Sequence, residues 1–448
     1  MTAHMTDAVL AESSREIIEQ CPTPTSTTGL VIRRSDQRMF EGQAESAIDV
    51  RKSLHVEEVP LPDLAADEVL VAVMASAINY NTVWSAMFRP IPTFRFLDKL
   101  AKGNPDLARH ATDQHILGSD AAGVVVRAGP SVRHWRVGDH VVVGTLHTDE
   151  QDPITQWDGM LSTSQRAWGF ETNFGGLAHY AIVKATQLLP KPAHLTWEEA
   201  ACSTLCLMTS YRMLISDRGA RVKIGDLVLV WGATGGLGAY ATQLAKAAGC
   251  QVVGVVSSAS KVELARSIGC DLVINRYDAP GADGLSSLEG WRWLGSRIRD
   301  HFGEDPHCVF EHVGRPTFGA SVYLARRGGT VVTCGSSHGY VHEFDNRHLW
   351  MNLKRIIGSH GANYQEAAEA NRLVQMGRIM PALSEVHPLT ESAEAVHRVH
   401  RNVHIGKVGV LCLAPSEGLG VTDLELRASI PAERLRLFRS DGPTVKGA

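Results

Sequence analysis

A strand, a glycine-rich turn and a helix follow one another in the middle of the 448-residue chain. The apolar run 226–231 predicts the strand, and 239–248 predicts the helix. Glycines allow a tight turn and close backbone approach, and a helix N-terminus attracts a pyrophosphate. We therefore predict a dinucleotide-binding turn with the contact residues Gly232, Thr234, Gly235, Gly236, Leu237 and Gly238.

Strands and helices continue to alternate after this turn. A helix is expected at 261–269, and strands are expected at 251–257, 271–274, 308–311 and 329–333. Such alternation predicts a parallel, doubly wound sheet of the Rossmann type. The expected fold class is therefore α/β, with a Rossmann domain at 216–356.

The segments on either side of this domain are rich in predicted strands. Residues 1–215 and 357–448 should together form a β-rich catalytic domain in which the Rossmann domain is nested. A helix is expected at 196–215, because Thr196 and Glu199 occupy the positions of a capping box. Two polar stretches, near 88–115 and 146–167, are expected to be surface insertions. The chain from Ser416 onward reads as a polar tail.

The end of the second strand of the Rossmann domain decides which dinucleotide is expected. Enzymes that use NADH place Asp or Glu there to bind the ribose hydroxyls. This chain has Ser257 and Ser258, followed by Lys261, and Arg276 comes after the next strand. Hydroxyls and cations accommodate a 2′-phosphate that a carboxylate would repel. We therefore expect NADPH as the cofactor.

Composition excludes several classes of partner. Lys and Arg number 44 against 48 Asp and Glu, so the net charge is −4, and this balance argues against nucleic-acid or polybasic membrane binding. The apolar run 69–78 is too short for a membrane helix, which needs about 18 residues. The first twenty residues lack the apolar core of a secretory signal. The eight cysteines are scattered without a CxxC motif, so we expect a cytoplasmic protein.

A dinucleotide domain nested in a β-rich domain raises the question of zinc, because zinc alcohol dehydrogenases share this plan. Where such enzymes carry Gly-His-Glu, this chain has Gly-Ser-Asp at 118–120, so the first histidine ligand is missing. No thiolate accompanies the close histidine pairs His338/His342 and His397/His400. We predict that no metal binds.

Six segments along the chain carry a more specific signal. They are LGSDAAGVV, WGFETNFGGLAHYAIVK, VWGATGGLG, FEHVGRPTFGASV, HEFDNRHLWMNLKRIIGSH and GKVGVLCLAP. In this order they resemble crotonyl-CoA carboxylase/reductases, which are zinc-free members of the medium-chain dehydrogenase/reductase superfamily. The resemblance extends over about 27–415, including both insertions. It implies a GroES-like catalytic domain around the Rossmann domain, and a homotetramer.

The resemblance also implies a reaction. The family reduces an α,β-unsaturated acyl-CoA with NADPH and traps the resulting enolate with CO2, which gives an alkylmalonyl-CoA for polyketide extension. Hydride transfer requires a positioned nicotinamide and a polarised thioester carbonyl. Carboxylation further requires that no proton reaches the enolate first.

In the family a CO2 pocket is formed by Asn, Phe, Glu and His, and the matching residues here are Asn81, Phe170, Glu171 and His360. The resemblance implies that the Asn81 amide donates to a CO2 oxygen. Glu171 and His360 would hold a water, and Phe170 would limit solvent entry. Hydrogen bonds of this kind strengthen as CO2 becomes a carboxylate, so they stabilise the transition state.

The CoA phosphates require cations, and the matching family positions are Arg327 and Arg347, with Tyr323 and His348 beside them. The family commonly has Lys where this chain has Arg327, and Tyr where it has His348. Both replacements retain groups that can contact a phosphate.

Two further departures concern the acyl group. Crotonyl-specific relatives usually have a bulky aliphatic residue before Trp168, and Phe after the site histidine, but this chain has Ala167 and Gly361. Both changes remove volume, and each extra buried methylene contributes about 0.8 kcal/mol. We therefore expect a medium- or long-chain 2-enoyl-CoA as the substrate.

Two other functions stay open at this stage. One is an enoyl-thioester or quinone reductase on the same fold, in which the enolate is simply protonated. The other is a nucleotide-binding protein without turnover. The mass of the product formed from an enoyl-CoA distinguishes among the three.

Overall fold

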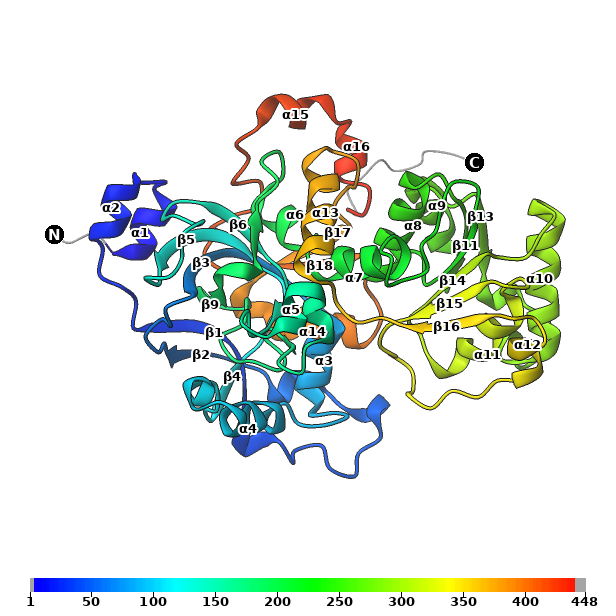
Figure 1. Ribbon diagram of the computed structural model, residues 1–448, viewed down its shortest axis with the longest axis horizontal. Coiled ribbons are helices and arrows are strands. Elements are labelled where there is room, and N and C mark those ends of the chain that lie inside the picture. Colours follow the sequence, from blue (N-terminus) through cyan, green and yellow to red (C-terminus); the bar gives the residue numbers. More distant parts are fainter. Residues whose placement is uncertain (1–3, 440–448) are drawn as a thin grey trace. The chain divides into compact units, whose positions relative to one another are not determined.

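The computed structural model describes residues 4–439 (Figure 1). The chain forms two compact units. The first unit comprises the chain up to residue 205 together with 363–375 and 383–432. The second unit comprises 206–362, 376–382 and, within the described residues, 433–439. Within the described residues, no helix is long and apolar enough to cross a membrane.

The second unit is built on a six-stranded sheet in the order β13-β12-β11-β14-β15-β16. Every pairing in it is parallel, which confirms the predicted doubly wound sheet. Its strands are β11 (Leu227–Trp231), β12 (Gln251–Val256), β13 (Leu272–Asn275), β14 (Cys308–Glu311), β15 (Thr330–Thr333) and β16 (Arg355–Gly358).

Helices cover this sheet, as Figure 1 shows for α8 and α9 and for α10 to α12. They are α8 (Gly236–Ala247), α9 (Val262–Ile268), α10 (Leu288–Phe302), α11 (Arg315–Leu324) and α12 (Asn346–Trp350), and α7 (Leu205–Leu214) precedes them. The core lies between the sheet and α10 and α11, where Leu229, Leu294 and Val309 are fully buried. Strands buried on both faces have continuous apolar runs, which explains the sequence pattern.

The first unit is built on a mainly antiparallel sheet in the order β10-β6-β5-β3-β18-β17, and β9 pairs with β3. Its strands are β3 (Glu68–Ala77), β5 (Ala122–Ala128), β6 (His140–Val143), β9 (Tyr180–Lys184), β10 (Leu188–Pro190), β17 (Leu383–Pro388) and β18 (Lys407–Leu411). Smaller sheets are formed by β1 (Ser26–Arg33), β2 (His55–Pro60) and β4 (Gln114–Ile116), and by β7 (Leu146–His147) and β8 (Arg166–Ala167).

Nine α-helices accompany these sheets in the described part of the first unit. They are α1 (Met5–Leu10), α2 (Arg15–Gln20), α3 (Tyr80–Met87), α4 (Phe94–Gly103), α5 (Pro153–Asp158), α6 (Trp197–Ala201), α13 (Tyr364–Gln375), α14 (Ser392–His400) and α15 (Leu424–Ser429). Helix α4 lies in the first polar stretch, yet it buries Phe94, Leu97 and Leu100 against the core. That stretch is therefore partly integrated into the core of the first unit. A further short helix, α16 (Ala432–Leu435), follows α15.

The helix expected at 196–215 is interrupted. Its start is as predicted, because Thr196 and Glu199 form a reciprocal capping box. The break between α6 and α7 has a tertiary cause: the Asp120 carboxylate accepts hydrogen bonds from the Thr204 hydroxyl and from the Leu205 N–H, the latter at 2.8 Å. A buried acceptor there competes with the helical hydrogen bonds.

The described part of the polar tail, residues 416–439, contains the helices α15 and α16. Arg427 on α15 donates to the Glu199 carboxylate at 2.7 Å and to the carbonyl of His194 at 2.8 Å. These bonds hold the tail against the start of α6.

Candidate active site

Asn81 lies in the first turn of α3, where its side chain meets the loop after β4. Its Nδ2 is 2.8 Å from Ser119 Oγ, and Ser119 Oγ is 2.7 Å from the carbonyl oxygen of Trp168. Ser119 is fully buried. One hydroxyl therefore connects Asn81 to the segment that carries Phe170 and Glu171.

That segment forms a tight turn in which three of the predicted residues meet. The Glu171 carboxylate accepts the N–H of Ala167 at 2.8 Å, and the N–H of Glu171 donates to the carbonyl of Ala167 at 2.7 Å. The Phe170 ring lies 6.4 Å from Trp84 of α3 and 5.7 Å from Phe96 of α4, measured between ring centroids. The structure of the first unit thus gathers Asn81, Ala167, Phe170 and Glu171.

The turn is held by close backbone approach and by a buried histidine. Gly169 has φ 68°, and a Cβ there would lie 1.9 Å from the carbonyl oxygen of Gly118. His115 bonds the Thr172 carbonyl through Nε2 at 3.0 Å and the Thr93 hydroxyl through Nδ1 at 2.8 Å. Burial lowers the pKa of His115 to about 4, so the ring is neutral at physiological pH, with Nε2–H as donor and Nδ1 as acceptor.

Beside Ser119 lies a buried ion pair that the sequence reasoning missed. Asp120 Oδ2 is 2.9 Å from Lys407 Nζ, and these side chains are 0% and 2% exposed. Asn79 bridges the pair, since its Nδ2 donates to Asp120 at 2.8 Å and its Oδ1 accepts from Lys407 at 2.5 Å. A signal was available in the sequence, because Asp120 and Lys407 stand next to apolar residues. Charged side chains are seldom fully buried unless they are paired.

The Gly-Ser-Asp run at 118–120 thus belongs to this hydrogen-bonded network. Within residues 4–439, no three His, Cys, Asp or Glu side chains cluster in a way that could hold a metal ion. That no metal binds stays a prediction.

In the second unit, the glycine-rich turn connects β11 to α8 as expected. Gly232 has φ 58°, and a Cβ on Gly238 would lie 2.2 Å from the carbonyl oxygen of Gly232. Thr234 is buried, and α8 begins at Gly236, directly after Gly235, with Leu237 in its first turn. A glycine turn at the N-terminus of a twelve-residue helix fits a dinucleotide pyrophosphate.

Two neighbours of this turn were not among the predicted site residues. The His312 ring bonds the Trp231 carbonyl through Nε2 at 2.8 Å, and burial lowers the pKa of His312. The fully buried Glu311 accepts from the N–H groups of Val313 and Gly314 at 2.8 and 3.0 Å. Both residues stand in the FEHVGR segment. His312 connects this segment to the end of β11, directly before the glycine turn, whereas Glu311 holds the loop after β14.

The groups expected around a 2′-phosphate lie near the end of β12. Ser257 and Ser258 follow this strand directly and are half-buried. Burial and the charge of Arg276 lower the pKa of Lys261, so the two cations are close enough to affect one another. The Arg276 guanidinium lies 4.8 Å from the centroid of the Tyr277 ring. Both predicted cations thus lie beyond the carboxyl ends of the neighbouring parallel strands β12 and β13.

The four residues expected to bind CoA gather around α12. The Tyr323 and His348 rings meet edge to face at 5.0 Å, and Arg327 Nη1 donates to the carbonyl of Met351 at 3.0 Å. Arg347 is exposed but not free of partners, because it forms a salt bridge with Asp345 at 2.6 Å. Hydrogen bonds from Arg347 lower the pKa of Asp345 to about 2. A phosphate on Arg347 would compete with this carboxylate.

His360 and Gly361 follow the edge strand β16 of the second unit. His360 is exposed, and the preceding Ser359 donates its N–H to the Thr333 carbonyl at 2.8 Å. Gly361 has φ 49°. A left-handed backbone favours glycine by about 1 kcal/mol or more. The backbone conformation therefore favours glycine at position 361, in addition to the predicted need for space beside the acyl chain.

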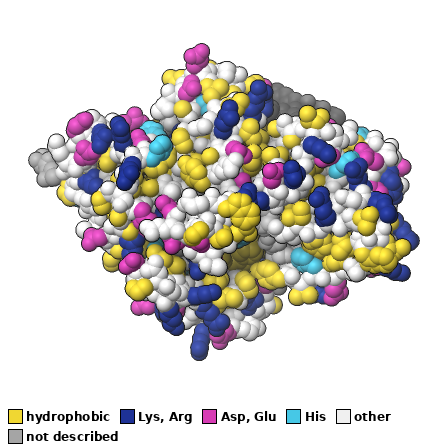
Figure 2. Space-filling model, in the orientation of Figure 1, with side chains coloured by type: hydrophobic (Ala, Val, Ile, Leu, Met, Phe, Trp, Pro, Cys, Tyr) yellow, Lys and Arg dark blue, Asp and Glu magenta, His cyan; other side chains and the backbone are white. Residues whose placement is uncertain are grey.

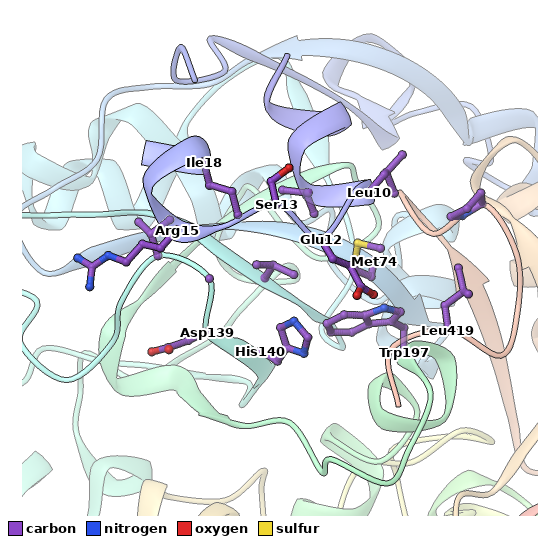
Figure 3. Close-up of a pocket in the computed structure, with 15 residues that line it drawn as sticks. Leu10, Glu12, Ser13, Arg15, Ile18, Met74, Asp139, His140, Trp197 and Leu419 are labelled. Atoms are coloured by element: carbon purple, nitrogen blue, oxygen red, sulfur yellow. The ribbon is translucent and has the colours of Figure 1, made fainter. Parts of the chain in front are cut away.

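A pocket of about 440 Å³ lies elsewhere in the first unit, between the two N-terminal helices and the β5–β6 connection (Figure 3). His140 and Trp197 form part of its wall, with ring centroids 4.7 Å apart. Glu12 and Arg15 contribute from the N-terminal helices and their connection. None of the predicted site residues lines it.

Over the face in view in Figure 2, Lys and Arg side chains alternate with Asp and Glu. The small net charge of −4 is thus distributed as a mixture of both signs on this face. That nucleic acid is not a partner stays a prediction.

Comparison with known proteins first defines the class. Residues 65–193 match the alcohol dehydrogenase GroES-like domain family, and residues 236–376 match the zinc-binding dehydrogenase family. The chain is therefore an oxidoreductase of the medium-chain dehydrogenase/reductase class, with a GroES-like and a Rossmann portion.

Longer matches define the family. The chain is 53% identical to the crotonyl-CoA reductase of Streptomyces collinus, over 90% of this chain and 92% of that protein. It is 40% identical to the crotonyl-CoA carboxylase/reductase of Cereibacter sphaeroides, over 82% and 86%. The solved 2-octenoyl-CoA carboxylase reductase CinF, from a Streptomyces species, in complex with NADP and 2-octenoyl-CoA, is 57% identical with a TM-score of 0.94, over 98% of this chain and 99% of that one. The chain belongs to the crotonyl-CoA carboxylase/reductase family.

Proposed function

We propose that this enzyme catalyses the NADPH-dependent reductive carboxylation of an α,β-unsaturated acyl-CoA to an alkylmalonyl-CoA, a polyketide extender unit. The observation that carries the proposal is the full-length match to CinF, which was solved with NADP and 2-octenoyl-CoA. The gathering of Asn81, Phe170 and Glu171 in the first unit supports it.

The chemistry balances without an added proton. NADPH, when bound, supplies a hydride for the β-carbon. The electron pair of the double bond then forms an enolate, whose α-carbon bonds to the carbon of CO2 and yields a carboxylate. If a proton reaches the α-carbon first, the product is the saturated acyl-CoA.

The residues of the first unit suit the carboxylating outcome. Asn81 has a second Nδ2 hydrogen beyond the one that Ser119 accepts, and it can donate to a CO2 oxygen. Glu171 uses one carboxylate oxygen for the Ala167 N–H, which leaves the other able to hold a water. Phe170 packs on Trp84 and Phe96 and limits water at this point. His360 is proposed to complete the set from the second unit.

The preferred substrate is a medium- or long-chain 2-enoyl-CoA. Ala167 stands in the same turn as Phe170 and Glu171, so a small side chain there leaves room for an acyl chain. Gly361 adds room beside His360. CinF, with 57% identity, was solved with a C8 enoyl-CoA. Arg327 and Arg347, with Tyr323 and His348, are proposed to bind the CoA phosphates.

The enzyme is proposed to act in the cytoplasm as a homo-oligomer, a tetramer by family resemblance. The edge strand β16 leaves Arg355, Ile356 and Gly358 exposed, and Trp350, Met351 and Leu353 before it are 61%, 53% and 67% exposed. An unpaired strand edge with neighbouring apolar side chains is suited to pairing with a second chain.

Product mass tests the proposal. The enzyme is incubated with NADPH, bicarbonate, carbonic anhydrase and 2-enoyl-CoA thioesters from crotonyl to 2-octenoyl. We expect the carboxylated product, with a higher kcat/KM for 2-octenoyl-CoA than for crotonyl-CoA. Saturated acyl-CoA as the only product at high CO2 would contradict the proposal.

Variants of the pocket residues refine the test. Glu171→Ala and Asn81→Leu should each shift the product from the alkylmalonyl-CoA toward the saturated acyl-CoA. Glu41→Ala, which changes an exposed glutamate of the same unit, serves as the control and should leave the ratio unchanged. Unchanged ratios in both pocket variants would remove these residues from the CO2 pocket.

A further inference from the structure

The hydroxyl of Ser119 has one hydrogen and two close oxygen or nitrogen partners. Its Oγ lies 2.7 Å from the Trp168 carbonyl oxygen and 2.8 Å from Asn81 Nδ2. A carbonyl oxygen can only accept, so the single hydrogen of Ser119 is directed to Trp168. Ser119 must therefore accept a hydrogen bond from Asn81.

This arrangement determines which way round the Asn81 carboxamide lies. The opposite orientation would place Asn81 Oδ1 against Ser119 Oγ with no hydrogen between two acceptors, which is unfavourable in a buried site. Asn81 Oδ1 therefore lies away from Ser119. It is buried and has no hydrogen-bond partner among the described residues.

We propose that Ser119 is a positioning residue for carboxylation: it holds the Asn81 carboxamide so that one Nδ2 hydrogen remains directed to a CO2 oxygen. The inference rests on the proposed role of Asn81. Without Ser119, the carboxamide can rotate and present its oxygen, which would repel the negative charge that develops on CO2.

The surroundings hold Ser119 itself in place. Its neighbour Asp120 is anchored by Lys407 through the carboxylate and by Ser76, which donates to the backbone carbonyl of Asp120 at 2.6 Å. Trp168, which receives the Ser119 hydrogen, is 1% exposed. Ser119 therefore connects a rigid buried network to the turn of Phe170 and Glu171.

Ser119→Ala tests the proposal. Loss of one hydrogen bond should raise the ratio of saturated to carboxylated product about fivefold, while KM for 2-octenoyl-CoA and for NADPH changes less than twofold. Ser53→Ala is the matched control, because Ser53 is equally buried and donates to the carbonyls of Val50 and Ala86 but bonds neither Ser119 nor Asn81. It should leave the product ratio as in the wild type, and an equal shift in this control would overturn the proposal.

Two further variants separate orientation from packing. Ser119→Cys keeps the connectivity of the side chain and leaves no cavity, but a thiol forms only weak hydrogen bonds, so this variant should also raise the ratio. It replaces Ser119→Ala in the test if that variant does not fold. A wild-type ratio in Ser119→Cys would assign the effect to packing and overturn the proposal. In the Asn81→Leu background, Ser119→Ala should add no further shift, and a further shift there would also overturn it.

The outcomes distinguish this inference from the proposed function. If Asn81→Leu shifts the product ratio but Ser119→Ala does not, the positioning role is wrong and the CO2 pocket stands. If neither variant shifts the ratio, the role of Asn81 itself is wrong.

Discussion

The two units hold their proposed functional groups in contrasting environments. In the first unit, Asn81 is hydrogen-bonded to the buried Ser119, and Glu171 accepts the backbone N–H of Ala167. The buried pair Asp120–Lys407 lies directly beside Ser119. In the second unit, Arg276 and Arg347 are exposed and Lys261 is half-buried. The contrast agrees with the ligands proposed for each, because an uncharged gas is held by fixed dipoles away from water, whereas a phosphate is attracted by accessible cations.

The contrast is sharpest between two lysine–aspartate pairs of similar length. Lys407 and Asp120 in the first unit are 2.9 Å apart and 2% and 0% exposed, whereas Lys246 and Asp271 in the second unit are 2.8 Å apart and 35% and 34% exposed. The two distances alone would suggest that both pairs contribute equally to stability. Removing one partner is costly only in the first pair. The charge that remains there is buried, so it has neither an opposite charge nor water beside it.

The largest expected effect follows from breaking these pairs. Lys407→Ala should lower the free energy of unfolding by about 3–5 kcal/mol, because it leaves Asp120 charged and buried. Lys246→Ala should lower it by at most about 1 kcal/mol. Denaturant unfolding of both variants measures the difference. Similar losses in the two would show that the burial of the pair has no energetic consequence.

The second effect is a loss of stability in acid that originates in the first unit. His147 is buried, neither ring nitrogen has a hydrogen-bond partner among the described residues, and burial lowers its pKa to about 3. The unfolded chain takes up this proton near pH 6.5 and the folded chain does not. Stability is therefore lost as the pH falls from about 6.5 toward 3, at up to about 1.4 kcal/mol per pH unit.

His147→Leu should remove this contribution. The fall in unfolding free energy between pH 7 and pH 5 should shrink by about 2 kcal/mol, because leucine has no proton to bind. His301→Leu on α10 replaces an exposed histidine of the second unit and should leave the fall unchanged. An unchanged fall in His147→Leu would mean that His147 is not the source.

The smallest effect concerns the exposed cations of the second unit. Lys261→Ala should raise the KM for NADPH about tenfold, which corresponds to about 1.4 kcal/mol, and should leave the KM for NADH within twofold. Lys246→Ala on the neighbouring helix α8 is the control and should change neither value. Steady-state kinetics with both cofactors measure the ratio. Equal changes for NADPH and NADH would show that Lys261 does not recognise the 2′-phosphate.

The nucleotide portion was predictable because its signals are local. The strand at 308–311 has the predicted limits, and Gly232 and Gly238 make the close backbone approach that the motif requires. Strand and helix periodicity needs only neighbouring residues. The break at 202–204 was not predictable in this way, because it depends on Asp120, which is more than eighty residues away in the chain.

In the proposed site, too, some residues were predictable from local motifs, whereas others depend on contacts between distant segments. The motif residues Asn81, Phe170 and Glu171 were identified from short segments, and the structure places them together. The groups that hold them were missed: Ser119 was considered only as a replaced zinc ligand, and Lys407 only as part of the GKVGVLCLAP segment. A polar residue within an apolar segment does not indicate its partner when that partner lies far along the chain.

By itself, the sequence determined the α/β class, the dinucleotide turn, the family and the residue types of the site. These properties depend on local periodicity and on short motifs whose chemistry is independent of their surroundings. Only the tertiary structure decided that Asp120 and Lys407 form a buried pair, that Arg347 is already bound to Asp345, and that Asn81 donates to Ser119. Each of these depends on burial and on distances between segments remote in sequence, since a charge or a hydroxyl acts according to what surrounds it.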